Sequence, residues 1–338
     1  MGPVVITGIG LEFPGLLEPA SLLSASAASL GPARFSPEEK LGRKGLLYKD
    51  RATRLALCAT HDALADAGLP VVASAQLCPE SLGVVVSSNL GNVDTVCQVV
   101  QAIHAGSVKD TSPLDLPNAS SNVIATTLAI RFGCRAVNLM VCNGATSGID
   151  ALHLAANAIR AGRARCVVVV GVEPLNPVVA KLMGESALAW LGTAEGLRLG
   201  EGAGAVVLEA RESARERGAR VYGRLGGYGF AAGMSVDASI GAALDGNGIV
   251  PRLWLTPNGT YPPTAETIRR ALGLWKDDPP LCLDLGLALG ETYGALGVLQ
   301  SIAACLWLRT QGETSALLTS GAAWGDGAAS LVIQREDA

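Results

Sequence analysis

The segment VCNGATSGIDAL, residues 141–152, combines the end of an apolar strand, a turn of small residues and the start of a helix. Enzymes use such a layout to hold a nucleophile at the start of the helix. The thiol here, Cys142, comes before the apex, and the apex is Ala145. The segment predicts the frame of a nucleophile site without its nucleophile, and we expect Cys142 to be a core residue.

The other thiols and imidazoles are scattered. The eight cysteines include no CxxC pair, and none of the three histidines has the spacing of a zinc ligand. This pattern predicts free thiols in a reducing cytoplasm, no metal site, and no secretory leader before VVITGIG. His61 and His153 fall on expected helices and His104 follows a helical segment, so we expect solvated or capping roles for them.

Composition limits the class of protein. A hydrophobic fraction of 49% and a mean hydropathy of +0.35 indicate a globular chain with a large core. Only 17% of the residues are charged and the net charge is −4, which argues against a nucleic-acid-binding surface. The longest strand-like run, CVVVVGV at 166–172, is too short to span a membrane. The low fraction of charged residues indicates that part of the surface is buried against a partner.

The elements that would position the turn follow an α/β pattern. Short apolar runs bounded by Gly and Asp alternate with segments of helical period, which is typical of strands covered by helices on both faces. The expected strands are 4–7, 82–87, 137–142, 166–172, 204–209, 223–230, 281–285, 316–320 and 328–334, and the expected helices are 50–67, 148–161, 263–274 and 294–309.

The chain also indicates an internal duplication. VVITGIG opens the first half and RVYGRLGGYG (220–229) opens the second, each as a strand that runs into glycine. Each half later has a helix rich in Ala, Gly and Leu, namely GIDALHLAANAIRAG and GALGVLQSIAACLWL. We therefore expect two similar halves, at residues 1–210 and 211–338, with the nucleophile turn at 141–148 in the first.

Four long segments resemble one family in order and spacing. They are VVITGIGLEFPG, PNASSNVIATTLAIRFGCRAVNL (117–139), GATSGIDALHLAANAIRAGRARCVVVVGVE (144–173) and LGEGAGAVVLEARESARERGARVYGRLGGYG (199–229). In these segments the chain resembles the β-ketoacyl synthase branch of the thiolase-fold condensing enzymes. The resemblance implies a thiolase-like fold, in which two duplicated α/β halves form α-β-α-β-α layers.

The resemblance also implies three catalytic side chains, a Cys at the helix start and two His from the second half. Matching TSG places the Cys position at Ala145, and the two His positions fall at Asn258 in TPNGTYPPTAETI and at Glu291 in ALGETYGALGVLQSI. We expect no catalytic residue, and Asn258 and Glu291 either fill a polar hole or orient a ligand. The loop GEGAGAV (200–206) lacks a nucleotide-binding fingerprint, so we expect no cofactor.

Among family members without the nucleophile, the chain most resembles a chain-length factor, the ketosynthase β subunit of type II polyketide and aryl-polyene-like systems. The resemblance implies a heterodimer with an active ketosynthase that works on acyl carrier protein. The strand before the turn would pair with its counterpart in the partner, through Val137, Leu139, Met140, Val141 and Cys142. The acyl tunnel would be lined by Pro117, Asn118, Ser120, Ser121 and Ile124.

Two other classes of function remain open. One is an acyltransferase or decarboxylase with a non-standard site at Asn258 and Glu291. The other is a homodimer that binds an acyl chain or an acyl carrier protein without reacting.

Overall fold

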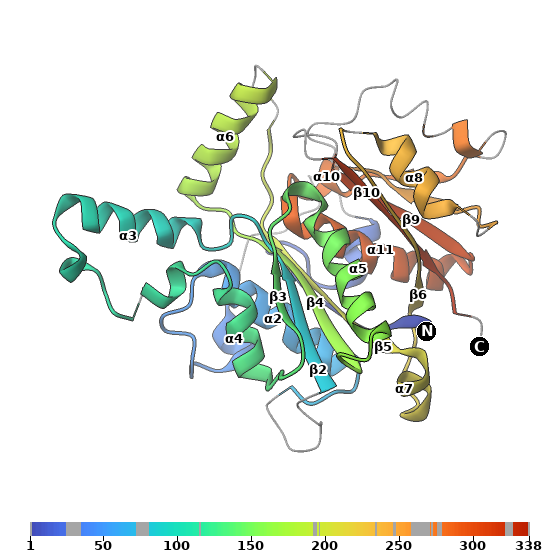
Figure 1. Ribbon diagram of the computed structural model, residues 1–338, viewed down its shortest axis with the longest axis horizontal. Helices are drawn as coiled ribbons and strands as arrows, with labels where there is room; N and C mark the ends of the chain where they lie inside the picture. Colours follow the sequence, from blue (N-terminus) through green and yellow to red (C-terminus); the bar gives the residue numbers. More distant parts are fainter. Residues whose placement is uncertain are drawn as a thin grey trace.

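The fold is described from a computed structural model, which covers residues 2–24, 35–71, 81–114, 116–191, 195, 197–233, 235–245, 248–257, 271, 273–275, 279–321 and 327–336. Within these residues, ten strands form one mixed sheet in the order β3-β2-β4-β5-β1-β6-β10-β9-β7-β8 (Figure 1). The strands are β1 (Val4–Glu12), β2 (Leu82–Ser87), β3 (Asn138–Val141), β4 (Cys166–Glu173), β5 (Gly202–Ala210), β6 (Gly223–Ala231), β7 (Leu253–Leu255), β8 (Leu281–Leu283), β9 (Ser315–Gly321) and β10 (Ala328–Gln334).

The sheet contains the same topology twice. The series β1-β5-β4-β2-β3 and β6-β10-β9-β7-β8 each begin with two antiparallel pairings and end with two parallel pairings. The two series join where β1 and β6 pair antiparallel, at Val5 opposite Arg224. The predicted duplication is therefore present in the fold. Because the sheet is continuous across the join, the boundary at residue 210 stays a prediction.

Helices cover the sheet in layers. The α-helices are α1 (Pro37–Leu41), α2 (Arg51–Asp66), α3 (Val93–Ala105), α4 (Val123–Phe132), α5 (Ser147–Arg160), α6 (Pro177–Leu191), α7 (Arg211–Glu216), α8 (Val236–Leu244), α10 (Leu285–Leu289) and α11 (Leu296–Gln311). Helices α5 and α11 contact each other and strands of both halves, and their core is the central one. Helices α2 and α4 cover the first half in a second core, and α8 covers the second half in a third. The three helical layers and the two halves of the sheet between them make five layers, which confirms the thiolase-like fold.

Local chemistry explains how the central elements form. Strand β4 is buried along its whole length, and its run of valines suits a strand covered on both faces. Helices α5 and α11 approach through Gly148 and Gly297, where a Cβ atom on Gly297 would lie 2.5 Å from the Ile149 nitrogen. Any larger residue at these two positions would push the central helices apart.

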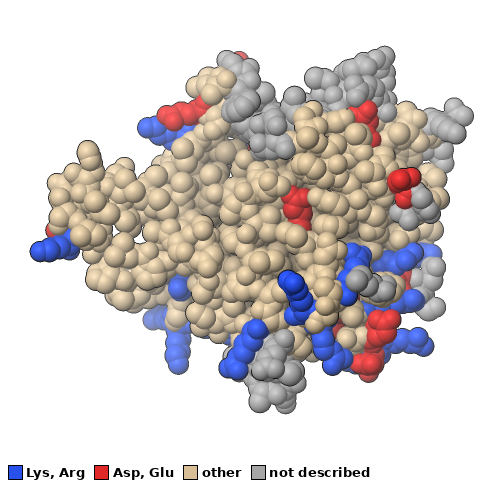
Figure 2. Space-filling view, in the orientation of Figure 1, with Lys and Arg blue, Asp and Glu red and all other residues tan. Residues whose placement is uncertain are grey.

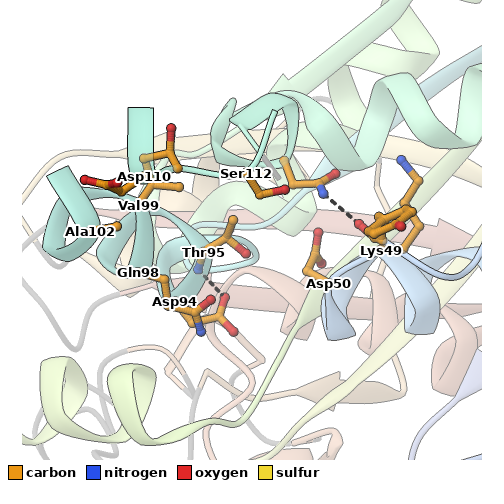
Figure 3. A pocket seen from close by; sticks show the side chains of 12 residues that line it. Lys49, Asp50, Asp94, Thr95, Gln98, Val99, Ala102, Asp110 and Ser112 are labelled. Atoms are coloured by element: carbon orange, nitrogen blue, oxygen red, sulfur yellow. Dashed lines mark hydrogen bonds between the residues drawn. The ribbon is translucent and has the colours of Figure 1, made fainter. Parts of the chain in front are cut away.

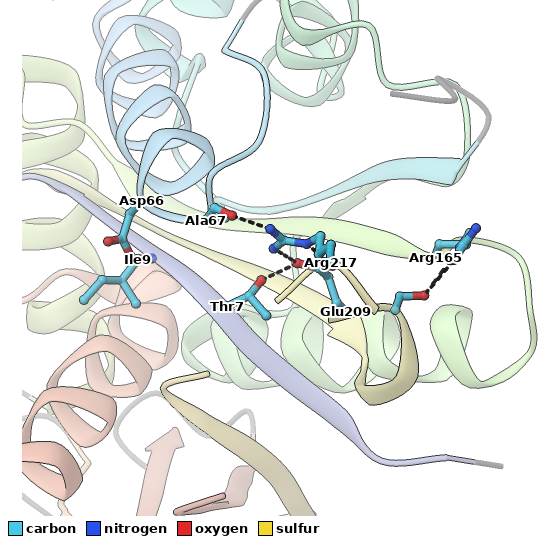
Figure 4. Close-up of polar contacts among 8 residues, drawn as sticks. Thr7, Ile9, Asp66, Ala67, Arg165, Glu209 and Arg217 are labelled. Atoms are coloured by element: carbon cyan, nitrogen blue, oxygen red, sulfur yellow. Dashed lines mark hydrogen bonds and ion pairs between the residues drawn. The ribbon is translucent and has the colours of Figure 1, made fainter. Parts of the chain in front are cut away.

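A buried ion pair connects the segment between α7 and β6 to strand β5 and to the end of α2. The Arg217 guanidinium, just after α7, donates to both carboxylate oxygens of Glu209 on β5 and, over 2.6 Å, to the Ala67 carbonyl at the end of α2 (Figure 4). Thr7 on β1 donates to the same carboxylate. The Glu209 side chain is only 4% exposed, so these donors replace the water that the carboxylate loses on folding.

One predicted strand needs correction, and a helix near the turn was not predicted. The strand predicted at 281–285 ends at Leu283, because the Asp284 carboxylate accepts from the Gly286 and Leu287 nitrogens and starts α10. Helix α6 was not expected, and it projects from the sheet near α3 (Figure 1). The helix expected at 263–274 lies almost wholly outside the described residues. No described helix is long and apolar enough to cross a membrane.

Candidate functional site

The candidate site is the turn between β3 and α5. A 3-10 turn, η5 (Gly144–Thr146), leads into α5, and Gly144 takes the left-handed conformation with φ 66°. The Asn89 side chain clamps this glycine, since its Oδ1 accepts from the Gly144 nitrogen and its Nδ2 donates to the Gly144 carbonyl, both over 3.0 Å. Ala145 lies at the apex and is buried. The frame of a nucleophile elbow is therefore formed, and it presents a methyl group.

Apolar side chains cover Ala145. It belongs to a small cluster with Val179, Met183 and Ala187 of α6, and Tyr293 packs against the same cluster. The unexpected helix α6 thus closes the space above the turn with side chains of this chain.

Asp150, one turn into α5, holds the other side of the elbow. Its Oδ2 accepts from Asn143 Nδ2 over 2.7 Å and from Thr146 Oγ1 over 2.8 Å, and its Oδ1 accepts from the Tyr228 hydroxyl over 2.9 Å. His153 stacks on the Tyr228 ring, and partial burial is the main reason that its pKa is lowered. This histidine therefore supports the frame as a neutral ring.

A buried carboxyl group that the sequence analysis missed lies beneath the elbow. Glu173, the last residue of β4, accepts from the Asn89 and Leu90 nitrogens over 2.7 and 3.0 Å and from the Ser88 hydroxyl over 3.1 Å. Burial raises the pKa of Glu173 to about 7, although these hydrogen bonds act in the opposite direction. The available signal was an acidic residue that closes the fully apolar run CVVVVGV.

Glu291 is the second buried carboxyl group at the site. It precedes the 3-10 turn η7 (Tyr293–Ala295), and its Oε1 accepts from the Tyr293 nitrogen over 2.6 Å. Its Oε2 is buried without a hydrogen-bond partner among the described residues. Burial raises the pKa of Glu291 to about 7, and Glu173 and Asp284 add to this by charge repulsion. Tyr293 has a φ of 41°, a strained value for a residue with a side chain.

The elbow and η7 are in contact, so the structure brings Ala145, Glu173 and Glu291 to one place. Turn η7 packs on η5, and a Cβ atom on Gly294 would lie 2.7 Å from Glu173 Oε1. Asn258, the third predicted position, lies outside the described residues. The described residues contain no group of three or more His, Cys, Asp and Glu that could hold a metal ion.

Cys142 corrects one expectation, because it is exposed and lies outside the core. It follows an edge strand, and its thiol donates to the Ser88 carbonyl over 3.0 Å. Partial burial, and then the Glu173 carboxylate, raise the pKa of Cys142, so the thiol is not activated.

The residues predicted to line a tunnel fall into two groups. Pro117, Ser120 and Ser121 are exposed. Ile124 is buried in the chain's own core, and Asn118 is buried with its Nδ2 donating to the Tyr48 carbonyl over 2.6 Å.

Asn118 also lines an open hollow of about 450 Å³ between α3, the 3-10 turn η3 (Val108–Asp110) and the start of α2. Figure 3 shows that Lys49, Asp50, Asp94 and Asp110 surround it. A tunnel role for the segment 117–124 stays a prediction.

The predicted interface residues lie on an edge. Strand β3 is the first strand of the sheet and pairs only with β2, so its other side has no strand partner within the described chain. Leu139 is 42% exposed, Val137 and Met140 are partly buried, and Val141 is buried. The interface itself stays a prediction.

Comparison with known proteins gives a family match and close likenesses of fold. The family model "Beta-ketoacyl synthase, N-terminal domain" matches residues 36–214. The chain is 29% identical over 294 residues to the granaticin polyketide putative beta-ketoacyl synthase 1 of Streptomyces violaceoruber, covering 72% of this chain and 69% of that protein. It is 27% identical over 300 residues to the 3-oxoacyl-[acyl-carrier-protein] synthase 2 of Vibrio cholerae, covering 79% and 72%.

Two solved structures share the fold at 19% sequence identity. One is the ishigamide ketosynthase/chain length factor, with a TM-score of 0.82 over 99% of this chain and 100% of the other. The second is AntDE:AntF, described as a type II PKS acyl-carrier protein in complex with its ketosynthase bound to the hexaketide, with a TM-score of 0.79 over the same shares.

Proposed function

The chain belongs to the beta-ketoacyl synthase family, and on that premise we propose that it is a chain-length factor, the silent partner of an active ketosynthase. In this role it forms a heterodimer, shapes the acyl tunnel of the pair and performs no condensation itself. The ketosynthase/chain length factor among the proteins of similar fold supports the proposal.

One observation carries the proposal. The elbow is held by the Asn89 clamp and by Asp150, yet Ala145 at its apex cannot attack a thioester. Several buried hydrogen bonds thus hold a frame that carries no nucleophile. A chain that keeps this frame without the reacting atom is expected to serve through its shape.

The two edges of the sheet differ in a way that favours β3 as the interface. The edge strand β8 occupies the equivalent place in the second half, where it is three residues long and follows Pro279 and Pro280. Proline beside a strand protects an edge from pairing with another strand, and this is what distinguishes β8 from β3, whose lengths differ by one residue. Strand β3 is flanked by Ala136, Val137 and Cys142, with no proline beside it. The centre of the face that contains β3 shows few charged side chains (Figure 2).

The segment 117–124 supports a tunnel role through its exposed small side chains. Ser120 and Ser121 lie at its exposed part, and the carbonyl of Ser120 accepts from Asn92 Nδ2 over 2.8 Å. This bond fixes the backbone, and the Ser120 hydroxyl donates to Asn122 Oδ1 over 2.7 Å, so two small, exposed side chains are left to border a partner's cavity.

Acyl carrier protein is the second proposed partner, bound through the complex. A mostly apolar hollow of about 220 Å³ lies between α2 and α4, and Lys49 and Arg131 are among the residues that line it. Arg43 and Lys44, both exposed, immediately precede Gly45, the first residue of the chain that lines this hollow. A carrier protein's prosthetic arm carries a phosphate, so this basic, apolar surface suits it.

The test is a reconstitution with purified proteins. The isolated chain and the ketosynthase produced beside it are assayed separately and mixed, with malonyl-loaded carrier protein. The proposal expects condensation only with the ketosynthase present, longer product in the mixture, and no acyl adduct on this chain. An acyl adduct or CO2 release with this chain alone would contradict it.

A further inference from the structure

Two buried carboxyl groups face the elbow from two different elements. Glu173 reaches it from the end of β4 and contacts Asn89, which clamps the turn. Glu291 reaches it from the residue pair before η7, and its Oε2 is buried without a hydrogen-bond partner among the described residues. A silent frame does not require an unpartnered buried carboxyl group, so Glu291 calls for an explanation.

Contacts link both carboxyl groups to the elbow, Glu173 through Asn89 and Glu291 through turn η7. Turn η7 packs on the elbow, and Tyr293 packs against the cluster that contains Ala145. The carbonyl of Gly294 accepts from the Ser87 hydroxyl, and a Cβ atom on Gly294 would lie 2.6 Å from Asn89 Nδ2 and 2.7 Å from Glu173 Oε1. Glu173 also acts on Glu291 and on Cys142 by charge repulsion. Glu173, Glu291 and Cys142 are therefore electrostatically coupled beside the elbow.

We propose that Glu291 is an electrostatic lock on the elbow, whose carboxylate, backed by Glu173, keeps any thiol at position 145 protonated. The elbow thus lacks its nucleophile, and the Glu291 carboxylate would also keep a thiol introduced there in its unreactive, protonated form. The lock goes beyond the partner role and does not depend on it.

Two opposing electrostatic effects would act on a thiol at position 145. The N-terminus of α5 favours a thiolate at position 145, because its free N–H groups and its dipole point there. Burial raises the pKa of Glu173 and Glu291 to about 7, so both are charged in the range above pH 8 where thiols ionise. The residues from α6 that cover Ala145 are apolar, so little solvent screens these charges.

The other titratable groups around position 145 do not offset the lock. Asp150 on α5 adds a third carboxyl group, which is bound to Asn143 and Thr146. Asp284 acts on Glu291 by repulsion. Cys142 is the remaining thiol beside the turn, and Tyr293 contributes a phenol. Arg198 is the cation next to Glu291, since its carbonyl accepts from the Glu291 nitrogen, but its guanidinium donates to the Leu287 and Ala288 carbonyls of α10.

Glu291 can be tested without breaking the frame. Glu173 accepts several hydrogen bonds that hold Asn89, so its removal would alter the turn. Glu291 accepts one side-chain bond, from the Tyr293 nitrogen, which the amide oxygen of glutamine can also accept. Glu291→Gln therefore removes the charge and keeps the shape.

The experiment uses the full chain with Ala145→Cys, alone and combined with Glu291→Gln. The control combines Ala145→Cys with Glu185→Gln, which removes an exposed carboxylate of α6. Alkylation of the new cysteine by iodoacetamide is followed from pH 6 to 10 by peptide mass spectrometry, which separates it from Cys142. Thiolate absorbance at 240 nm, relative to the same variants with Ala145, gives the ionisation midpoint even if the reagent enters slowly.

The lock predicts a midpoint above that of an ordinary thiol in the single variant and in the control. It predicts a midpoint lower by at least one pH unit, a tenfold change in the ionisation constant, when Glu291→Gln is added. Equal midpoints in all three variants would overturn the lock. Native mass spectrometry with the ketosynthase is run on the same variants, and its result tests the partner role separately.

Discussion

Asn89 and Gly144 exchange two hydrogen bonds of 3.0 Å, so the end of the β2 strand fixes the peptide that precedes Ala145. Glu173 in turn holds Asn89 through its backbone and side chain. These contacts run from Glu173 on β4 through Asn89, just after β2, to the turn. They explain why the elbow keeps its form without a nucleophile.

Asn89→Ala should destabilise the protein by about 2–3 kcal/mol, because it removes both bonds to Gly144 and leaves that peptide without its partners. The free energy of unfolding in urea measures the effect. Asn157→Ala is the control, since Asn157 is exposed and its side chain bonds to His153 and Arg160 among the described residues. A loss no larger than that of the control would show that the clamp is dispensable.

Glu291 should make stability depend on pH. Its pKa is about 7 in the folded chain and 4.5 as the reference value, so the folded state holds the proton more tightly. Its contribution is therefore favourable below pH 4.5, declines as the pH rises from 4.5 to 7, and stays low above 7, a change of about 3 kcal/mol. Glu291→Gln should be more stable than the natural chain at pH 8 and show a flatter profile, measured by urea unfolding at several pH values. An unchanged profile would contradict the burial of an ionisable group here.

Arg217→Ala should cost about 3–5 kcal/mol, because it leaves the Glu209 carboxylate buried without its cation. Arg217→Lys should recover only part of the loss, since lysine cannot donate in the same fork. Arg165, which pairs with Glu216 on the surface, provides the matched control, and its replacement by alanine should cost less than about 1 kcal/mol. Similar losses at both arginines, by thermal and urea unfolding, would argue against the role given to Glu209.

Leu139→Arg should weaken pairing with the ketosynthase at least tenfold while leaving the chain folded. Leu139 is 42% exposed in the isolated chain, so its replacement costs the monomer little. Ile130→Arg, on the exposed side of α4, is the control with a similar change on another surface. Titration calorimetry with the partner measures the difference, and equal affinities would remove β3 from the interface.

Ser120→Trp and Ser121→Trp should shorten the product of the pair, because a large ring would block a cavity bordered by these exposed side chains. Thr310→Trp, at the exposed end of α11, is the control. Product length is read by mass spectrometry after reconstitution. Products of unchanged length in both variants would exclude this segment from the tunnel.

Much of the fold could be predicted, because long motifs fixed the order of the elements. The glycines of VVITGIG and the valine run before Glu173 specify strands through local patterns. Local capping contacts could not be predicted from these patterns, as at Asp284, where a side chain starts a helix within an expected strand. Cys142 was misplaced because an apolar strand suggests burial, whereas β3 is an edge.

The candidate site was only partly predictable. The alanine at the apex and Glu291 could be aligned by motif. Glu173 could not, because its importance arises from contacts with Asn89 and Leu90, which are far away in sequence. The same holds for α6, whose cover over Ala145 depends on tertiary packing.

The central claim is that this chain works as one half of an unequal pair. Native mass spectrometry of the protein, isolated at its natural level through a mild tag, tests it most directly. The account predicts a one-to-one complex with a ketosynthase that has the nucleophilic cysteine. A clean homodimer of this chain would contradict it and direct attention to Glu291 as a reacting group.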